Sequence, residues 1–127
     1  MAVNKTATEI ITEASLAASA TTALADCTAV DCTKATQLVF VFVGTFNASA
    51  TDGATITLWP SYDGTNYDTS GWNSWTWGIA VDAGNTVREH SLAISPVPKY
   101  MKIKVTNADS SYTITALKVF AIKQTAG

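Results

Sequence analysis

Few side chains in this 127-residue chain could carry catalysis, and their spacing argues against it. His90 is the only histidine, and Glu89 precedes it in a predicted strand. Neighbouring side chains of a strand point to opposite faces, so Glu89 cannot orient the imidazole of His90. The sequence holds no Gly-x-Ser-x-Gly nucleophile motif and no glycine-rich phosphate loop. Most aspartates stand at predicted turns, where turn chemistry explains them. We therefore predict that the protein is not an enzyme.

Two short segments contain residue types that bind metals, but neither has the spacing of a familiar site. Asp63, Asn66 and Asp68 place three oxygen ligands within six residues, yet their order differs from an EF-hand loop, and a turn explains Asp-Gly. Cys27 and Cys32 are five positions apart, and a zinc site would need two more ligands. A disulfide would need a turn between them, because thiols at this spacing on a strand face opposite ways. We predict reduced cysteines, with the disulfide as the alternative, and neither a metal nor another cofactor.

Aromatic side chains gather in the middle of the chain, interleaved with Gly, Ser, Asn and Asp. The candidate interface residues are Trp59, Tyr62, Tyr67, Trp72, Trp75 and Trp77. Trp and Tyr anchor many protein interfaces, and an exposed row of rings also suits sugar stacking. A third interpretation places Trp75 and Trp77 in the core, on the same strand face as Ile79. A protein contact, a carbohydrate platform and packing within the fold all stay open at this point.

Charge excludes one large class of partners. The formal net charge is −2 and the isoelectric point is about 5.1, which argues against nucleic-acid binding through phosphate neutralisation. Residues 1–98 carry three basic and nine acidic side chains, whereas residues 99–127 carry five basic and one acidic. Lys102 and Lys104 share one predicted strand face, either as a solvated surface or as an electrostatic docking site. The longest apolar run, Leu38 to Val43, is too short to cross a membrane, and we expect neither a secretory leader nor a membrane partner.

The composition and the apolar periodicity both predict strands. The chain contains 20 Thr and 20 Ala residues. Strands are predicted at residues 37–46, 54–59, 75–81, 87–94, 101–106 and 112–123, and from weaker patterns at 9–18 and 23–29. A shift of the apolar phase in the last strand indicates a β-bulge near Ala116. We predict an all-β, jelly-roll-like antiparallel β-sandwich of about eight strands. It forms a single domain, 1–127, in which residues 1–8 are free to act as a flexible N-terminal arm.

Two stretches resemble a known family. The first is the turn Trp59-Pro60-Ser61-Tyr62-Asp63-Gly64-Thr65-Asn66-Tyr67-Asp68, and the second is Ile94-Ser95-Pro96-Val97-Pro98 with the lysine-bearing strand that follows. Together with the Ala/Thr-rich, charge-poor start, they resemble small β-sandwich structural proteins of tailed bacteriophages, of the head-decoration or cement type. The resemblance covers roughly residues 36–123. It implies a virion protein, made in the host cytoplasm, that binds the major capsid protein of a phage and stabilises the head.

Residues 37–46 are β-branched or aromatic on both faces, which indicates a strand buried on two sides or a strand with one face against a partner. With the aromatic loops and the N-terminal arm, this pattern favours self-association, and the resemblance implies a homotrimer. The alternative function is a carbohydrate-binding β-sandwich module, or a phage tail component that contacts the host surface through the Trp/Tyr-rich loops.

Overall fold

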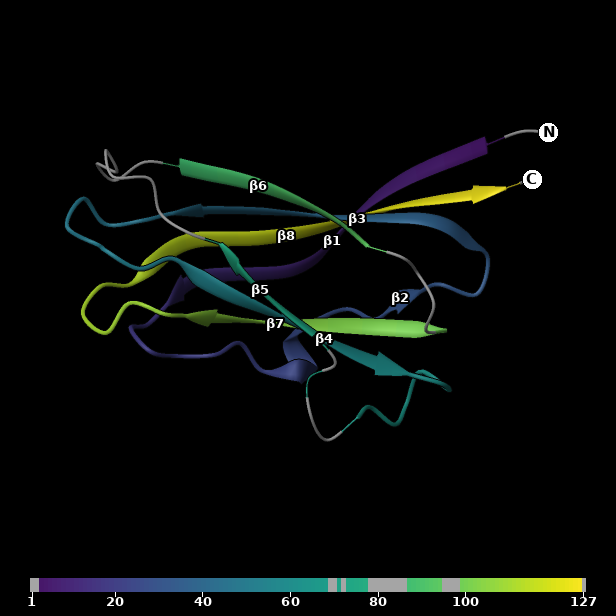
Figure 1. Ribbon diagram of the computed structural model, residues 1–127, viewed down its shortest axis with the longest axis horizontal. Helices are drawn as coiled ribbons and strands as arrows, with labels where there is room; N and C mark the ends of the chain where they lie inside the picture. Colours follow the sequence, from purple (N-terminus) through teal and green to yellow (C-terminus); the bar gives the residue numbers. More distant parts are fainter. Residues whose placement is uncertain (1–2, 69–70, 72, 78–86, 95–98, 127) are drawn as a thin grey trace.

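The structure is a computed structural model that describes residues 3–68, 71, 73–77, 87–94 and 99–126. Its strands are β1 (Val3–Leu16), β2 (Val30–Asp31), β3 (Ala35–Thr45), β4 (Ala54–Ser61), β5 (Asn73–Trp77), β6 (Val87–Ile94), β7 (Tyr100–Asn107) and β8 (Ile114–Ala126). A short 3-10 helix, η1, covers Leu24–Asp26. The first sheet has the order β1-β8-β3-β6 and the second sheet the order β2-β7-β4-β5 (Figure 1). The described elements are strands apart from η1, and all described strand pairs are antiparallel. The prediction of an all-β, antiparallel fold is confirmed.

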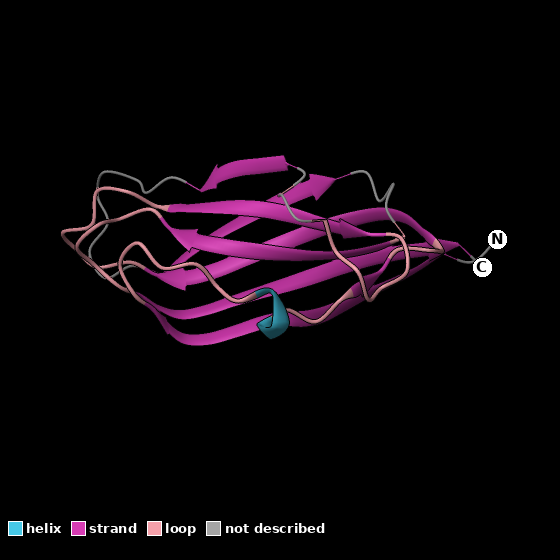
Figure 2. Ribbon diagram, turned by 90° about the horizontal axis from the view of Figure 1, so that it is seen from below, coloured by secondary structure: helices cyan, strands magenta, loops and turns pink. Residues whose placement is uncertain are grey.

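The two sheets share one hydrophobic core, because alternate residues of each strand point between them. Phe40 and Phe42 of β3 are fully buried there, whereas Val39 and Val41 on the other face of β3 remain partly exposed. Of the two interpretations of this strand, burial on both faces is therefore wrong, because the second face of β3 is partly exposed. Figure 2 shows the strands of both sheets running along the length of the molecule, with the segment that carries η1 beside them at mid-length.

Bulges interrupt the regular pairing on both sides of β8. At Ala116 the backbone has a φ of 51°, and β8 inserts an extra residue between its pairs with Val43 and Thr45, which confirms the predicted bulge. A second bulge lies in β1, where Glu9 and Ile11 pair with successive residues of β8. Ile10 and Ile11 are consequently both buried although they are adjacent in the chain.

The N-terminal quarter of the chain differs most from the sequence-based expectation. The strand predicted at 9–18 exists but begins at Val3, so residues 3–8 pair with β8 and are not a free arm. The strand predicted at 23–29 is wrong, because this segment holds η1 and follows the edge of β7 through side-chain contacts. Thr22 Oγ1 accepts a hydrogen bond from Val105 N–H at 3.0 Å, and Cys27 Sγ accepts one from Ile103 N–H at 3.5 Å. Positions 78–81 of the strand predicted at 75–81 lie outside the described residues.

A buried polar cluster joins three segments at one end of the sheets. Asn107 is fully buried, and its Nδ2 donates to the carbonyl oxygens of Leu16 at 3.1 Å, Ala17 at 3.3 Å and Tyr112 at 2.8 Å. Its Oδ1 accepts the N–H of Asp109 at 3.1 Å. The side chain therefore links the end of β1 to the β7–β8 turn, with its donors and its acceptor in use.

Candidate ligand-binding face

The outer surface of the second sheet carries two aromatic rings, each with a lysine over it. We call Trp59, Tyr67, Lys102 and Lys104 the lysine–aromatic face. Lys104 Nζ lies 4.3 Å from the centroid of the Trp59 ring, and Lys102 Nζ lies 5.1 Å from that of Tyr67. Both distances are within the range of a cation–π interaction. The four side chains are partly exposed, so the face is accessible but ordered.

The strand alternation of β7 and its register with β4 build this face. Met101, Ile103 and Val105 of β7 point into the core, so Lys102 and Lys104 must point outward. The register places Trp59 directly opposite Lys102. Lys104 therefore reaches diagonally across to the Trp59 ring, whereas Lys102 lies over the ring of Tyr67, which follows β4 and is bridged to Ser61.

The loop after β4 is held by a compact hydrogen-bond network around Asp63. Asp63 Oδ1 accepts the N–H groups of Thr65 at 2.9 Å and Asn66 at 2.8 Å, and Oδ2 accepts Asn66 Nδ2 at 2.7 Å. These backbone donors, Asn66 first, hold the pKa of Asp63 well below its usual range. Gly64 adopts a φ of 78°, and a Cβ there would lie 3.3 Å from the Tyr100 ring. The loop is thus locally fixed, with both oxygens of its best candidate calcium ligand already accepting hydrogen bonds.

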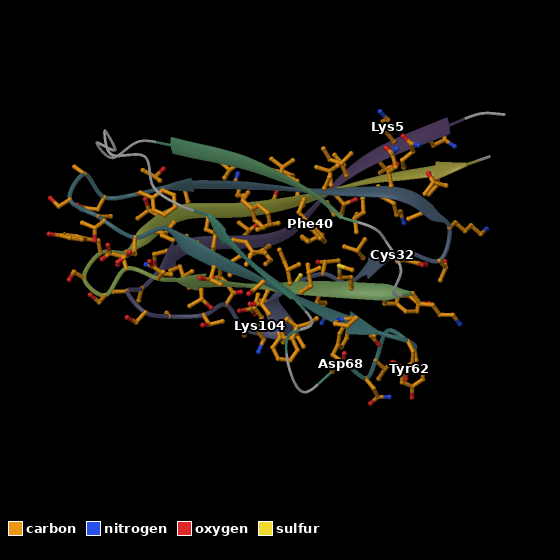
Figure 3. The ribbon with its side chains drawn as sticks, in the orientation of Figure 1. Lys5, Cys32, Phe40, Tyr62, Asp68 and Lys104 are labelled. Carbon is orange, nitrogen blue, oxygen red and sulfur yellow. The ribbon has the colours of Figure 1, made fainter. Side chains whose placement is uncertain are left out.

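This fixed loop presents an exposed ring beside the lysine–aromatic face. Tyr62 is 73% exposed, the largest exposure of any large hydrophobic side chain in the described residues. In Figure 3, Tyr62, Asp68 and Lys104 lie on the same side of the molecule, the lower side of that view. Further along the β4–β5 connection, Gly71 lies so close to Thr57 that a Cβ would clash with the threonine methyl group. Gly71 therefore lies directly over the outer surface of β4.

Two polar atoms of the face lack partners among the described residues. Trp59 Nε1 and Tyr67 Oη are both buried and accept or donate no hydrogen bond there. Burial raises the pKa of the Tyr67 phenol above its ordinary value. An unpaired buried polar atom costs free energy, so these two atoms lower the stability of the face.

The structure brings three of the six predicted aromatic residues to this side of the molecule: Trp59, Tyr62 and Tyr67. Trp75 and Trp77 stand in β5, where they pair with Ile56 and Ala54 of β4, but their side chains are outside the described part of the chain. Trp72 is also outside it.

Sequence reasoning identified these rings and, separately, the shared strand face of Lys102 and Lys104. It did not predict that the lysines lie over the rings. That placement depends on the β4–β7 register, in which Trp59 pairs with Lys102, 43 positions further along the chain.

The other residues considered for chemistry form no further site among the described positions. His90 lies in β6 and pairs with Phe42 of β3. No group of three His, Cys, Asp or Glu side chains in the described ranges could hold a metal ion. Cys27 and Cys32 are free and buried, so the alternative disulfide is not formed. Burial raises the pKa of the Cys32 thiol to about 11. No helix in the described segments is long and apolar enough to span a membrane.

A hollow of about 160 Å³ opens between β1, β2 and β8. Thr8, Asp31 and Lys123 contribute its polar wall, and Ile10 and Val30 its apolar wall. Lys123 Nζ donates to the carbonyl oxygen of Asp31 at 2.9 Å. The only charged donor of the hollow is thus already bonded within the protein.

No protein-family model and no curated protein sequence matches the chain. Among solved structures it is similar to the cleaved adhesin domain of Lys-gingipain from Porphyromonas gingivalis, with 16% sequence identity and a TM-score of 0.46 over 80% of this chain. It is also similar to dimeric latent PorU from the same bacterium, with 11% identity and a TM-score of 0.40 over 97% of this chain. The chain spans 61% of the adhesin-domain chain and 10% of the PorU chain.

Both of these structures are bacterial proteins, and neither is a phage head protein. The predicted phage family, the head-decoration function and the virion location are therefore wrong. The physical reason lies in the turn that carried the resemblance. Ser61, Asp63 and Gly64 are explained by the hydrogen bonds and the backbone conformation of a tight loop, which β proteins of many families use.

Proposed function

We propose that the chain is a non-enzymatic recognition domain that binds carbohydrate on the lysine–aromatic face and the adjoining Tyr62 loop. The observation that carries the proposal is the pair of rings, Trp59 and Tyr67, held on an outer sheet surface by Lys104 and Lys102. Sugar rings combine an apolar C–H face with many hydroxyl groups. A site for them needs flat aromatic surface and a few fixed polar groups.

The Tyr62 loop supplies the accessible stacking surface for such a ligand. Its phenol ring is exposed, while the network around Asp63 fixes the backbone that carries it. A fixed loop loses little conformational entropy on binding, which favours affinity. Asp68, also exposed, and the ammonium group of Lys104 offer an acceptor and a donor for hydroxyl groups.

The proposal includes a jelly-roll-like arrangement of the two sheets. What supports it is that all sheet neighbours except β4 and β5 are distant in the chain, with β8 between β1 and β3 and β7 between β2 and β4. Such a fold presents an outer sheet surface and its end loops as one recognition area.

Binding is tested by titrating soluble neutral and acidic polysaccharides while tryptophan fluorescence is recorded. Tyr62→Ala is expected to weaken binding by ~10-fold, the loss of one aromatic anchor. Tyr112→Ala is the matched control, because Tyr112 is the other exposed large ring among the described residues and it bonds to Asn107 and Asp109 through its backbone atoms. Polysaccharide recovered after long incubation is expected to keep its length.

Three results would count against the proposal. The first is the absence of any fluorescence or calorimetric response at millimolar ligand. The second is equal weakening by Tyr62→Ala and Tyr112→Ala, which would place binding elsewhere. The third is shortened polysaccharide, which would contradict the non-enzymatic part.

A further inference from the structure

The outer edge of β1 is open over its first half. β1 stands at the end of the order β1-β8-β3-β6 and pairs only with β8 among the described strands. On its other side, Thr28 N–H donates a hydrogen bond to the carbonyl oxygen of Ile10 at 2.8 Å. Residues 4–9 are exposed on both faces, and Figure 1 shows this half of β1 diverging from the second sheet together with the end of β8.

An edge of this kind is a template for another strand, because its outward N–H and C=O groups have no partner in the sheet. Proteins often protect such edges with Pro, a bulge, an inward-pointing charge or charged edge side chains such as Lys. Here the bulge at Ile10 lies at the inner end of the open stretch, residues 3–9 contain no Pro, and the charge of Lys5 is accompanied by the opposite charge of Glu9. The second sheet differs in this respect, since the free side of β7 is covered by residues 20–28.

We propose that this edge pairs antiparallel with the same edge of a second copy, about a two-fold axis at Ala7, so that two first sheets form one continuous sheet. This register is self-complementary. It places Lys5 opposite Glu9 of the second copy and Glu9 opposite its Lys5, with the threonines at 6 and 8 facing one another. Lys5, Ala7 and Glu9 share one face of the strand, so both charge pairs form on the same side.

The sequence of the edge favours a second copy over other strands. In the register about Ala7 the pair of Lys5 and Glu9 forms twice, once on each side of the two-fold axis. The small Ala7 side chain lies on the axis, opposite Ala7 of the second copy. Glu9 also accepts a hydrogen bond from the Thr12 hydroxyl, which holds the carboxylate on the exposed surface of β1. A two-fold contact of this type closes after two copies, so it yields a dimer rather than the trimer expected from the sequence.

Charge reversal provides the test. Lys5→Glu and Glu9→Lys each convert both attractive cross-strand pairs into repulsive ones, and each is expected to raise the dimer dissociation constant by ~10-fold or more. The double variant Lys5→Glu/Glu9→Lys restores opposite charges at both positions and is expected to recover the wild-type value. An equimolar mixture of the two single variants is expected to form the mixed dimer in preference to either homodimer. Lys34→Glu, at an exposed lysine outside this edge, is the matched control.

Sedimentation velocity and native mass spectrometry give the masses, and circular dichroism confirms that each variant is folded. A wild-type mass of 13.4 kDa at millimolar concentration would overturn the proposal. So would a dimer that is equally stable in the single variants, because the contact would then lie elsewhere. Hydrogen exchange adds a readout that does not depend on the variants. Amides of residues 4–9 that lack protection from β8 are expected to become protected as concentration rises, and their unchanged exchange would also contradict the edge contact.

Discussion

The substitution Asn107→Asp tests whether the buried polar cluster stabilises the fold as its hydrogen bonds indicate. The side chain is fully buried, and Nδ2 is the donor to three carbonyl oxygens, at 2.8 to 3.3 Å. An aspartate has the same shape but no N–H group, so the ionised carboxylate would face carbonyl oxygens that have lost their donor. Each unsatisfied buried group costs about 1–3 kcal/mol. Loss of the two N–H donors predicts a decrease of about 3 kcal/mol in the free energy of unfolding.

For a chain of this length that decrease corresponds to a fall in Tm of about 10 °C. The measurement is urea unfolding at pH 7, followed by tryptophan fluorescence and by circular dichroism to check that the transition is two-state. Asn47→Asp is the matched control. Asn47 uses its Oδ1 to accept the N–H of Ser49 at 2.9 Å, which an aspartate accepts equally well, so its cost should stay below ~0.5 kcal/mol. Equal stability of the two variants would refute the role given to the Asn107 donors.

Three further outcomes follow from single groups. Hydrogen bonds from backbone N–H groups, that of Ser111 first, lower the pKa of Asp109 from 3.8 to about 2. The ionised carboxylate therefore contributes its full stabilisation of the fold above about pH 4, and this stabilisation is lost as the pH falls towards 2. The free energy of unfolding of Asp109→Asn, measured by urea titration, should depend less on pH over this range. Gly64→Ala should lower the free energy of unfolding by about 1 kcal/mol in the same assay, because Gly64 has a positive φ that alanine adopts at a cost. An unchanged free energy would mean that the loop rearranges freely. Cys27 and Cys32, buried with raised pKa values, should resist iodoacetamide at pH 8 until urea unfolds the chain.

The strands that sequence reasoning located well are those with one core face and one outer face. In β4 and β7 the period-2 alternation coincides with burial, so Ile56 and Ile103 point inward as expected. The bulge at Ala116 was also predictable, because it shifts the apolar phase within a single strand. Local pattern was sufficient in these cases because each residue's environment depends on its own strand.

The N-terminal quarter was poorly predicted because its structure depends on distant parts of the chain. The Thr22 hydroxyl and the Cys27 thiol, in the segment before β2, accept hydrogen bonds from the edge of β7. Each bond joins residues more than seventy positions apart in the sequence. No local pattern encodes such a contact. For the candidate site, the rings at 59, 62 and 67 were predicted as a group. The placement of the lysines over them was not, since that placement is a property of register.

The bulge at Ile10 explains both why the sequence pattern did not predict the first half of β1 and why that half has the open edge proposed as a contact. With Ile10 and Ile11 both buried, the alternation of the strand changes phase, so no single periodicity runs from Val3 to Leu16. After the bulge, towards Leu16, the strand contributes to the core. Before it, residues 4–9 have no core face, and among the described strands they pair only with β8. A second copy would add a ladder to residues that bury little in the monomer. It would do so on the first sheet, which leaves the lysine–aromatic faces of both copies accessible on their second sheets. Two accessible faces on one dimer raise the apparent affinity for a repeating polysaccharide through effective concentration, without any new contact to the ligand.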